Sequence, residues 1–317
     1  MVKTKIIIIT GTGGILGTGH FQRMLNLAVN LNSTNYFSAS IQLKQNEHPL
    51  PEKFSDFFIN TIPSDTDLII RDMRDSSREE MTILKQSAPV LAIDDSGQGR
   101  ESADYSLNLL PVPSADLKTS RPDMSLFLYG YNFAEGISAL TKKKYYKRDI
   151  DITIYTGYNP SSELLSAIRK SIPASACSVL LKEGKTENFT GLILQSEIPY
   201  AEIISRSKIV ITHFGLTMFE AEACGCRIAA LNPTIYHGSL TDLIRNDFNI
   251  IYSSVYESFS ADALKKVIQK KLENTTDLSI SIPDILKKIN SGTLNFIKYI
   301  ETITNITPSN SADRENR

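Results

Sequence analysis

A glycine-rich turn that ends in a histidine follows the first apolar run of the chain. Residues 10–20, TGTGGILGTGH, come directly after Ile6 to Ile9 and precede a helical pattern. Glycines let a backbone approach a ligand closely, and the start of the next helix offers free amides and a positive dipole end to an anion. At that helix start the dipole favours a neutral His20 imidazole, which can accept a proton near pH 7. A histidine that only caps the helix is the alternative, but beside this turn we expect His20 to be a catalytic base.

The same turn also fits T-G-x-x-G-x-x-G, the fingerprint of NAD-dependent short-chain dehydrogenases and sugar epimerases. Two features of the chain disfavour that alternative. The second strand region, 36–43, ends without the acidic residue that would bind an adenosine ribose, and the chain contains no Tyr-x-x-x-Lys pair. We therefore predict no cofactor.

Acidic residues follow two later apolar runs of the chain. Asp72 follows one run, and Asp94 and Asp95 follow the next. Open α/β sheets bind ligands at the carboxyl ends of their strands, so Asp72 and Asp95 are candidate ligand contacts. An ion pair of Asp72 with Arg74 is an equally good structural explanation. Turn formation or helix capping explains Asp75 and Asp94 better than ligand binding does.

A third turn, residues 213–225 with the sequence HFGLTMFEAEACG, joins a predicted strand to a predicted helix. The helix start at Gly215 and Thr217 offers backbone amides and a hydroxyl to a phosphate. Glu220 lies one turn further, from where its carboxylate reaches either ribose hydroxyls or the first amides of its own helix. Both roles of Glu220 stay open. His237, in the polar loop after the next strand, adds a second imidazole.

Short β-branched runs alternate with helical periods along the chain, a pattern typical of parallel βαβ units. The predicted strands are residues 5–9, 68–70, 90–93, 152–155, 178–181, 208–211 and 227–231. The predicted helices are residues 21–31, 79–85, 161–171, 200–205, 218–223, 261–272 and 285–302. The basic run 141–148 is a predicted linker, with a solvated helix end as the alternative. After it the strand, glycine turn and helix begin again. This repetition predicts two doubly wound halves, with a last helix that can cross back to the first.

Composition narrows the function classes. The chain has 317 residues, enough for two cores, and its 41% hydrophobic and 22% charged residues are typical of globular proteins. Its 34 Lys and Arg against 35 Asp and Glu leave no basic excess, so we predict no nucleic acid partner. Three cysteines without a CxxC pattern indicate a cytoplasmic location. No apolar run approaches the roughly 20 residues of a membrane helix, although a peripheral membrane contact stays open.

These motifs resemble the family of the UDP-sugar hydrolase of pseudaminic acid biosynthesis and its spore-coat-polysaccharide relatives, itself similar to the peptidoglycan N-acetylglucosaminyltransferase. The resemblance covers about residues 5–240. The matched family elements are residues 17–23 (GTGHFQR), 93–95 (IDD), 104–108 (DYSLN), 130–131 (GY), 156–157 (TG) and 217–225 (TMFEAEACG). The chain departs from the family at residues 71–73 (RDM), 214–215 (FG) and 236–237 (YH). These departures predict a different sugar pocket.

The resemblance implies an α/β protein of the GT-B fold, with two Rossmann-like domains that face each other across a cleft. We predict an N-terminal sugar and acceptor domain at residues 1–146, a C-terminal nucleotide-binding domain at 147–306 and a disordered tail at 307–317. His20 is the expected catalytic base. The expected nucleotide and diphosphate ligands are Gly157, Gly215, Thr217 and Glu220. The expected sugar or acceptor contacts are Gly17, Gly19, Asp72, Asp95, Tyr131 and His237.

The predicted function is chemistry at the anomeric carbon of a nucleotide-sugar, with a UDP-sugar as the first candidate. A helix start that stabilises the leaving diphosphate makes a metal unnecessary, so we predict a metal-independent enzyme. The enzyme would act with inversion, by transfer or by hydrolysis, in the biosynthesis of surface glycans or nonulosonic-acid-type sugars. A non-catalytic nucleotide-sugar-binding protein, or a subunit that depends on a partner, is the alternative. The oligomeric state is left open.

Overall fold

The computed structural model describes most of the chain. The described residues are 2–13, 17–46, 50, 52–111, 124–142, 145–157, 160–182, 185–190, 198–273 and 279–305. The predicted tail, 307–317, lies outside them, as do residues 14–16 of the first glycine turn.

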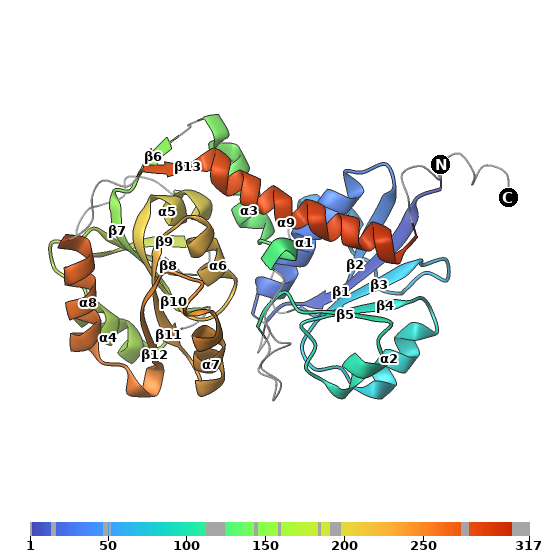
Figure 1. The fold of residues 1–317 in the computed structure, drawn as a ribbon, viewed down its shortest axis with the longest axis horizontal. Coiled ribbons are helices and arrows are strands. Elements are labelled where there is room, and N and C mark those ends of the chain that lie inside the picture. Colours follow the sequence, from blue (N-terminus) through green and yellow to red (C-terminus); the bar gives the residue numbers. More distant parts are fainter. Residues whose placement is uncertain are drawn as a thin grey trace. The chain divides into compact units, whose positions relative to one another are not determined.

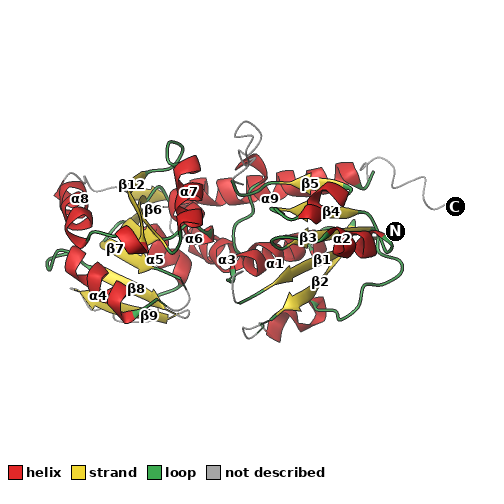
Figure 2. Cartoon of the chain, turned by 90° about the horizontal axis from the view of Figure 1, so that it is seen from below, coloured by secondary structure: helices red, strands yellow, loops and turns green. Residues whose placement is uncertain are grey.

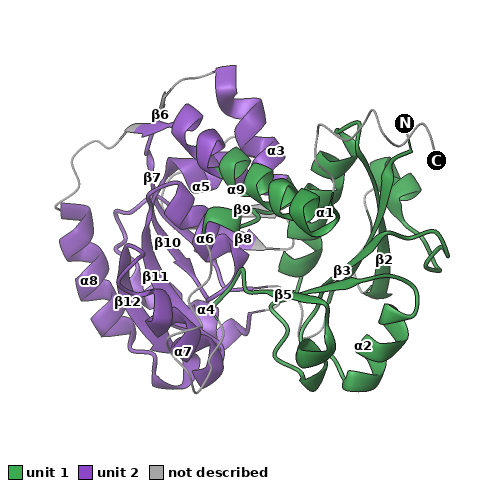
Figure 3. Cartoon of the chain, turned by 45° about the vertical axis from the view of Figure 1, so that its right-hand side comes forward, with its two compact units in different colours: residues 1–131, 289–317 green, residues 132–288 purple. Residues whose placement is uncertain are grey.

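The chain divides into two compact units, which Figure 3 colours separately. Unit 1 comprises Met1–Tyr131 and Ile289–Arg317, and unit 2 comprises Asn132–Lys288. The predicted boundary follows residue 146, with a last helix that can cross back to the first half. In the structure the C-terminal part of the last helix belongs to unit 1, because its apolar side chains pack into the core of that unit.

Unit 1 is built on a five-stranded parallel sheet. Its strands are β1 (Thr4–Gly11), β2 (Phe37–Gln45), β3 (Leu68–Asp72), β4 (Val90–Ile93) and β5 (Tyr105–Leu107). Its helices are α1 (Gly19–Asn32), α2 (Arg78–Lys85) and the C-terminal part of α9 (Ile282–Ile303), with 3-10 turns η1 (Glu52–Phe57), η2 (Gln98–Ser102) and η3 (Met124–Leu126).

Both faces of this sheet are buried, as is usual for parallel sheets. Alternate residues of β1 point to opposite faces: Ile6 and Ile8 pack with α1 and α9, whereas Ile7 and Ile9 pack with α2. Phe296 of α9, which is completely buried, lies in the same cluster as Ile6. Figure 2 shows the helices in red beside the strands in yellow.

Unit 2 is built on a six-stranded sheet. Its strands are β7 (Ile150–Tyr155), β8 (Ser178–Lys182), β9 (Lys185–Thr190), β10 (Ser207–Thr212), β11 (Arg227–Asn232) and β12 (Ile250–Val255). Its helices are α3 (Tyr131–Ala139), α4 (Ser162–Ser171), α5 (Tyr200–Arg206), α6 (Leu216–Ala223), α7 (Ile235–Ile244) and α8 (Ala261–Glu273), with 3-10 turns η4 (Leu140–Lys142) and η5 (Tyr256–Ser258). α4 and α8 cover one face of the sheet, and α5 and α6 cover the other (Figure 1).

Part of the predicted linker 141–148 forms regular structure. Residues 145–147 form strand β6 (Tyr145–Lys147), which pairs antiparallel with β13 (Ser279–Ser281). Backbone hydrogen bonds to a strand more than 130 positions away hold this segment, and its own basic sequence gives no sign of that partner.

The two sheets share one strand order. In unit 1 it is β2-β1-β3-β4-β5, and in unit 2 it is β9-β8-β7-β10-β11-β12 with only β9 antiparallel. The order reverses between β1 and β3 in unit 1, and between β7 and β10 in unit 2. Doubly wound sheets bind ligands beyond the carboxyl ends of the strands at such a switch point. The fold therefore designates one candidate site in each unit.

Candidate functional site

His20 is held at the switch point of unit 1. It is the second residue of α1, it is 8% exposed, and the helix begins at Thr18 without a side-chain cap. Gly13 donates its N–H to the carbonyl of Gly17 at 2.9 Å, which closes the turn before the helix. Gly17 has a φ of +62°, a left-handed conformation that favours glycine, and Gly19 is the first helical residue.

The imidazole of His20 is oriented by the carboxylate of Asp72. Asp72 is the last residue of β3 and is completely buried. Its Oδ1 lies 2.8 Å from Nδ1 of His20. Because a carboxylate accepts hydrogen bonds, Nδ1 carries the proton in the neutral ring, and Nε2 keeps the lone pair of a general base. Asp72, predicted as a sugar contact, lies behind the histidine.

Arg23 joins Asp72 to a second carboxylate. Its Nε and Nη2 donate to the two oxygens of Asp72 at 2.7 and 2.5 Å, and Nη2 also donates to Asp94 Oδ2 at 2.6 Å. Burial alone would raise the pKa of Asp72, but the charge of Arg23 and the hydrogen bonds from Arg23 and His20 outweigh it and bring that pKa well below its usual value. Asp72 therefore stays ionised as the partner of the histidine.

Asp94 makes its own connection in this network. Its Oδ1 accepts the N–H groups of Leu109 and Leu110 at 2.7 and 2.8 Å, and its φ is +49°. Such a conformation is uncommon for a non-glycine residue and is tolerated by aspartate. The turn role that the sequence analysis preferred for Asp94 matches these bonds.

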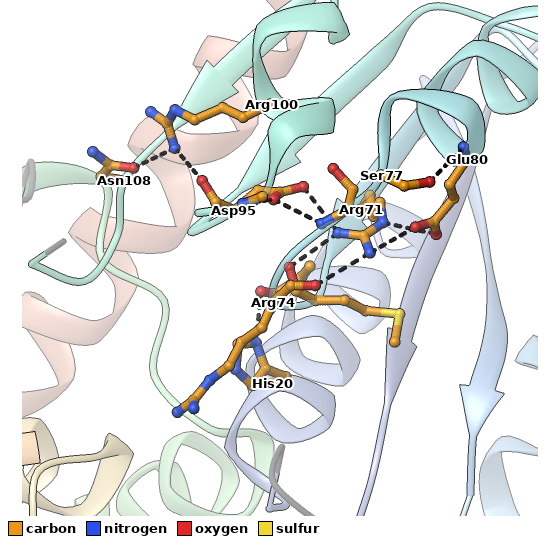
Figure 4. Close-up of polar contacts among 12 residues, drawn as sticks. His20, Arg71, Arg74, Ser77, Glu80, Asp95, Arg100 and Asn108 are labelled. Carbon is orange, nitrogen blue, oxygen red and sulfur yellow. Dashed lines mark hydrogen bonds and ion pairs between the residues drawn. The ribbon is translucent and has the colours of Figure 1, made fainter. Parts of the chain in front are cut away.

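Asp95 lies in a neighbouring network with Arg71 (Figure 4). Its Oδ2 accepts from Arg71 at 3.0 Å, and its Oδ1 accepts the N–H groups of Ser76 and Gly97 at 3.0 and 2.8 Å. Arg71 also binds both oxygens of Glu80, at 3.0 and 3.1 Å. Asp95 is completely buried, so these bonds give it a role in holding the turn after β4. The structure brings Asp72 to His20, and it gives Asp95 different partners.

Tyr131 is placed beside the 3-10 turn η1. Its hydroxyl accepts a hydrogen bond from Lys53 at 3.1 Å, and its ring meets Phe54 edge-on with centroids 5.0 Å apart. The ammonium of Lys53 also lies 4.8 Å from the centre of the Tyr131 ring. Tyr131 thus belongs to an aromatic and cationic group on unit 1.

His213 occupies the switch point of unit 2, directly after β10. Two glycines approach its ring so closely that a Cβ on Gly157 would lie 3.2 Å from Nε2, and one on Gly215 would lie 3.3 Å from Cε1. Gly157 has a φ of +99°, which strains any other residue. Nδ1 of His213 lies 2.7 Å from the carbonyl of Phe214, so Nδ1 is the donor. Burial lowers the pKa of His213, although this hydrogen bond opposes the shift.

Helix α6 begins immediately after this turn. Its N-cap is Gly215, with no side-chain cap, so the helix start relies on other partners for its first amides. Thr217 and Glu220 lie three positions apart on α6, 8% and 3% exposed. Tyr200, the first residue of α5, has its hydroxyl 3.0 Å from Thr217 Oγ1 and hydrogen-bonded to Glu220 Oε2. Burial first, and then the charge of Glu220, raise the pKa of Tyr200 well above its usual value.

Two buried polar atoms at this switch point have no hydrogen-bond partner among the described residues. They are Oγ1 of Thr156, which follows β7, and Nδ2 of Asn232, which ends β11. The orientation of the Asn232 amide is fixed, because its Oδ1 accepts the N–H of Phe214 at 2.9 Å. An unmade hydrogen bond of a buried group costs about 1–3 kcal/mol. Both atoms flank the strand that leads into His213, so a polar ligand there would supply the missing bonds.

His237 lies next to His213 at the same edge of the sheet. The two rings are nearly perpendicular, with centroids 6.3 Å apart. Nδ1 of His237 lies 2.8 Å from the hydroxyl of Thr234, the N-cap of α7. The structure thus gathers His237, Gly157, Gly215, Thr217 and Glu220 around one end of the unit 2 sheet.

Arg23, His213 and Tyr200 are among the site residues that received no role from the sequence. Arg23 and His213 were part of the quoted motifs, and Tyr200 was only a helix start. Arg23 follows His20 by three positions, which places both on one helix face, so this spacing was a usable signal. Tyr200 had no such signal, because its partners are 17 and 20 positions away.

Two general searches of the described residues add to this account. No helix in the described part of the chain combines the length and hydropathy needed to span a membrane. Within those same residues, no three His, Cys, Asp or Glu side chains gather as metal ligands do.

Comparison with known proteins gives a fold. No family model matches the chain, and no curated protein matches it. The glycotransferase of kitacinnamycin superposes with a TM-score of 0.57 at 8% identity, over 97% of this chain and 100% of that one. The UDP-GlcNAc 2-epimerase from Neisseria meningitidis, bound to UDP-GlcNAc, gives 0.53 at 11% identity, over 94% and 100%. LpCGTa in complex with UDP gives 0.55 at 11% identity, over 96% and 100%.

At such low identities the likeness concerns architecture. It spans both Rossmann-like units and nearly the whole length of each neighbour. The narrower resemblance to the sugar hydrolase family stays a prediction. Two doubly wound units with the same strand order, together with these neighbours, show that the chain is an α/β protein with the GT-B fold.

Proposed function

We propose that this protein is an enzyme that cleaves the anomeric bond of a nucleotide-sugar, most simply a UDP-sugar. The observation that carries the proposal is the hydrogen bond between His20 and Asp72, because it leaves Nε2 of a buried imidazole as a proton acceptor. A GT-B protein with such a base at one switch point has the group needed to activate a hydroxyl.

Unit 2 supplies the proposed nucleotide site. The uncapped start of α6, the hydroxyl of Thr217 and the His213 ring suit a diphosphate, and Glu220 suits the ribose. The unpaired atoms of Thr156 and Asn232 support a polar ligand at this edge. Two structural neighbours carry UDP or UDP-GlcNAc, which makes uracil the first base to test.

In the proposed reaction, His20 acts on the acceptor while unit 2 holds the leaving group. Nε2 takes the proton of a hydroxyl or of water, whose oxygen forms a bond to the anomeric carbon. The bond from that carbon to the β-phosphate oxygen breaks, and its electron pair leaves with UDP. The carboxylate of Asp72 stabilises the imidazolium that forms. Attack opposite the leaving group inverts the anomeric configuration.

The resemblance supports a reaction in the biosynthesis of surface glycans or nonulosonic-acid-type sugars, either as transfer or as hydrolysis. Hydrolysis needs only water beside His20, whereas transfer needs a second organic substrate. The sequence departures at Asp72 and His237 favour a sugar different from that of the hydrolase.

The test is release of nucleoside diphosphate from a panel of UDP-, GDP- and CMP-sugars, with CMP release followed for the last group. Each sugar is tried with and without alcohol acceptors, with wild type and His20→Asn. We expect UDP release by wild type and a loss of about 10²–10⁴-fold in the variant, the usual contribution of a general base. UDP affinity, measured by calorimetry, should stay within about threefold, because the proposed nucleotide ligands belong to unit 2.

Two outcomes would contradict the proposal. Equal turnover by wild type and His20→Asn would rule out His20 as the general base. A change of sugar configuration without release of nucleotide would indicate epimerisation. Tight binding of a UDP-sugar without turnover on any acceptor would support the non-catalytic alternative.

A further inference from the structure

One tyrosine connects the two α6 side chains that the proposed nucleotide site uses. The hydroxyl of Tyr200 contacts Thr217 Oγ1 at 3.0 Å and Glu220 Oε2 by a short hydrogen bond. Its ring packs edge-on against Phe133 in the same unit, with centroids 6.4 Å apart. Tyr200 starts α5, which packs beside α6.

The protons in this contact can be counted. A tyrosine hydroxyl has one proton, and an ionised carboxylate has none. Tyr200 therefore donates to Glu220, and the contact with Thr217 is a hydrogen bond only if Thr217 donates its own single proton to Tyr200. The result is a directed chain from Thr217 through Tyr200 to Glu220.

This series of hydrogen bonds occupies the same side-chain groups that a bound nucleotide would need. The Thr217 hydroxyl has a single proton, so it cannot donate to a phosphate oxygen while it donates to Tyr200. A ribose hydroxyl that donates to the same lone pair of Glu220 Oε2 would replace the Tyr200 hydroxyl, which is also a neutral donor. Tyr200 thus supplies a buried carboxylate with a hydrogen bond when no ligand does.

We propose that Tyr200 is an internal competitor of the nucleotide: its hydroxyl is exchanged for ribose and phosphate oxygens when a ribonucleoside diphosphate binds. This inference rests on the proposed function, because it assigns Thr217 and Glu220 to the nucleotide. The competitor sets the affinity of the site, weakening ribonucleotide binding by the hydrogen bonds that must first be released.

The experiment compares two ligands with wild type and Tyr200→Phe. UDP has both ribose hydroxyls, and 2′,3′-dideoxyuridine diphosphate has neither, so only UDP gains from a vacated Glu220. We expect the ratio of dideoxy to ribo dissociation constants to rise about tenfold in Tyr200→Phe, with UDP itself bound more tightly. Tyr252→Phe is the matched control, since the Tyr252 hydroxyl lies 3.5 Å from the Ser260 carbonyl, away from α6, and its ratio should equal that of wild type.

Other outcomes overturn the proposal. A lower ratio in Tyr200→Phe would show that Tyr200 positions Glu220 for the ribose. An unchanged ratio, with both ligands weakened equally, would show a purely structural residue. Thermal unfolding establishes that the variant is folded, and Tyr200→Leu, which also lacks the hydroxyl, should give the same raised ratio. Absence of UDP binding to wild type would overturn the proposed nucleotide site itself, which distinguishes that failure from a failure of the exchange.

Discussion

The two switch points have the same topology and opposite chemistry. In unit 1 the site consists of charged groups that bind one another: Arg23 pairs with Asp72 and Asp94, and Asp72 also holds His20. In unit 2 the corresponding place has glycine turns and hydroxyls around His213, whose pKa is lowered by burial. The matching strand ends, that of β3 in unit 1 and that of β10 in unit 2, thus carry a carboxylate, Asp72, in one unit and an imidazole, His213, in the other.

This difference indicates how one architecture can divide two tasks. Paired charges preorganise a proton acceptor, because the groups that orient it are already hydrogen-bonded before a substrate binds. A ligand site needs the reverse, namely donors that gain partners only when an anion arrives. Unpaired Thr156 and Asn232 in unit 2 fit that second role. Unit 1 has such donors as well, since the hydroxyls of Thr10 and Ser76 are buried without a partner among the described residues.

The sharpest test of the division is Asp72→Asn. The amide of Asn donates its N–H to Nδ1 of His20, which moves the imidazole proton to Nε2 and removes the acceptor. We expect turnover to fall by about 10³–10⁴-fold, as tautomer reversal does in other histidine-dependent enzymes, with UDP affinity within about threefold. Steady-state kinetics and calorimetry measure the two quantities.

Asp65→Asn serves as the control for Asp72→Asn. It changes an exposed carboxylate of the same unit that pairs with Lys5, so turnover should not change. A loss of UDP affinity as large as the loss of turnover in Asp72→Asn would break the comparison between the units.

Arg23→Met tests whether the charges of unit 1 depend on one another. The substitution leaves Asp72 and Asp94 buried without their cation, a change that costs about 3–5 kcal/mol. Urea unfolding should show that loss in the free energy of unfolding. Arg78→Met breaks the exposed pair with Glu101 and should cost under about 1 kcal/mol. Similar losses in both variants would mean that the buried network contributes no more than a surface pair.

The sequence predicted the elements that position each site and some of the residues within them. The β-branched runs located β1, β3, β7 and β10 to within about two residues, because each strand is buried on both faces. β12 was not predicted, since its residues Tyr252, Ser253 and Ser254 are polar and only half-buried at the edge of the sheet. Composition identifies a strand well only where burial requires apolar residues.

Side-chain partners were harder to predict than elements. Asp72 was expected to contact a ligand or to pair with Arg74, but it binds Arg23 and His20, which lie 49 and 52 positions away. The strand order brings β1 and β3 together, and no local pattern states that order. The same limit applies to Tyr200, whose role follows only from the packing of α5 beside α6.

The smallest expected effect is the pH dependence of ligand binding at His213, which tests the difference in charge between the two switch points. Its Nδ1–H is used by the Phe214 carbonyl, so a phosphate can accept a hydrogen bond only from a protonated Nε2. Burial lowers the pKa of His213 in the free protein, and a bound diphosphate would raise it again. Affinity should therefore increase as pH falls from about 8 towards 6, and level off below the pKa of His213 in the free protein.

UDP-GlcNAc is the suitable probe for this pH dependence, since its diphosphate diester has no ionisation in that range. We expect up to about a tenfold gain for wild type and for His20→Asn, and a flat profile for His213→Asn. A slope that survives in His213→Asn would assign the proton to another group and leave unit 2 without a chargeable ligand for the phosphate.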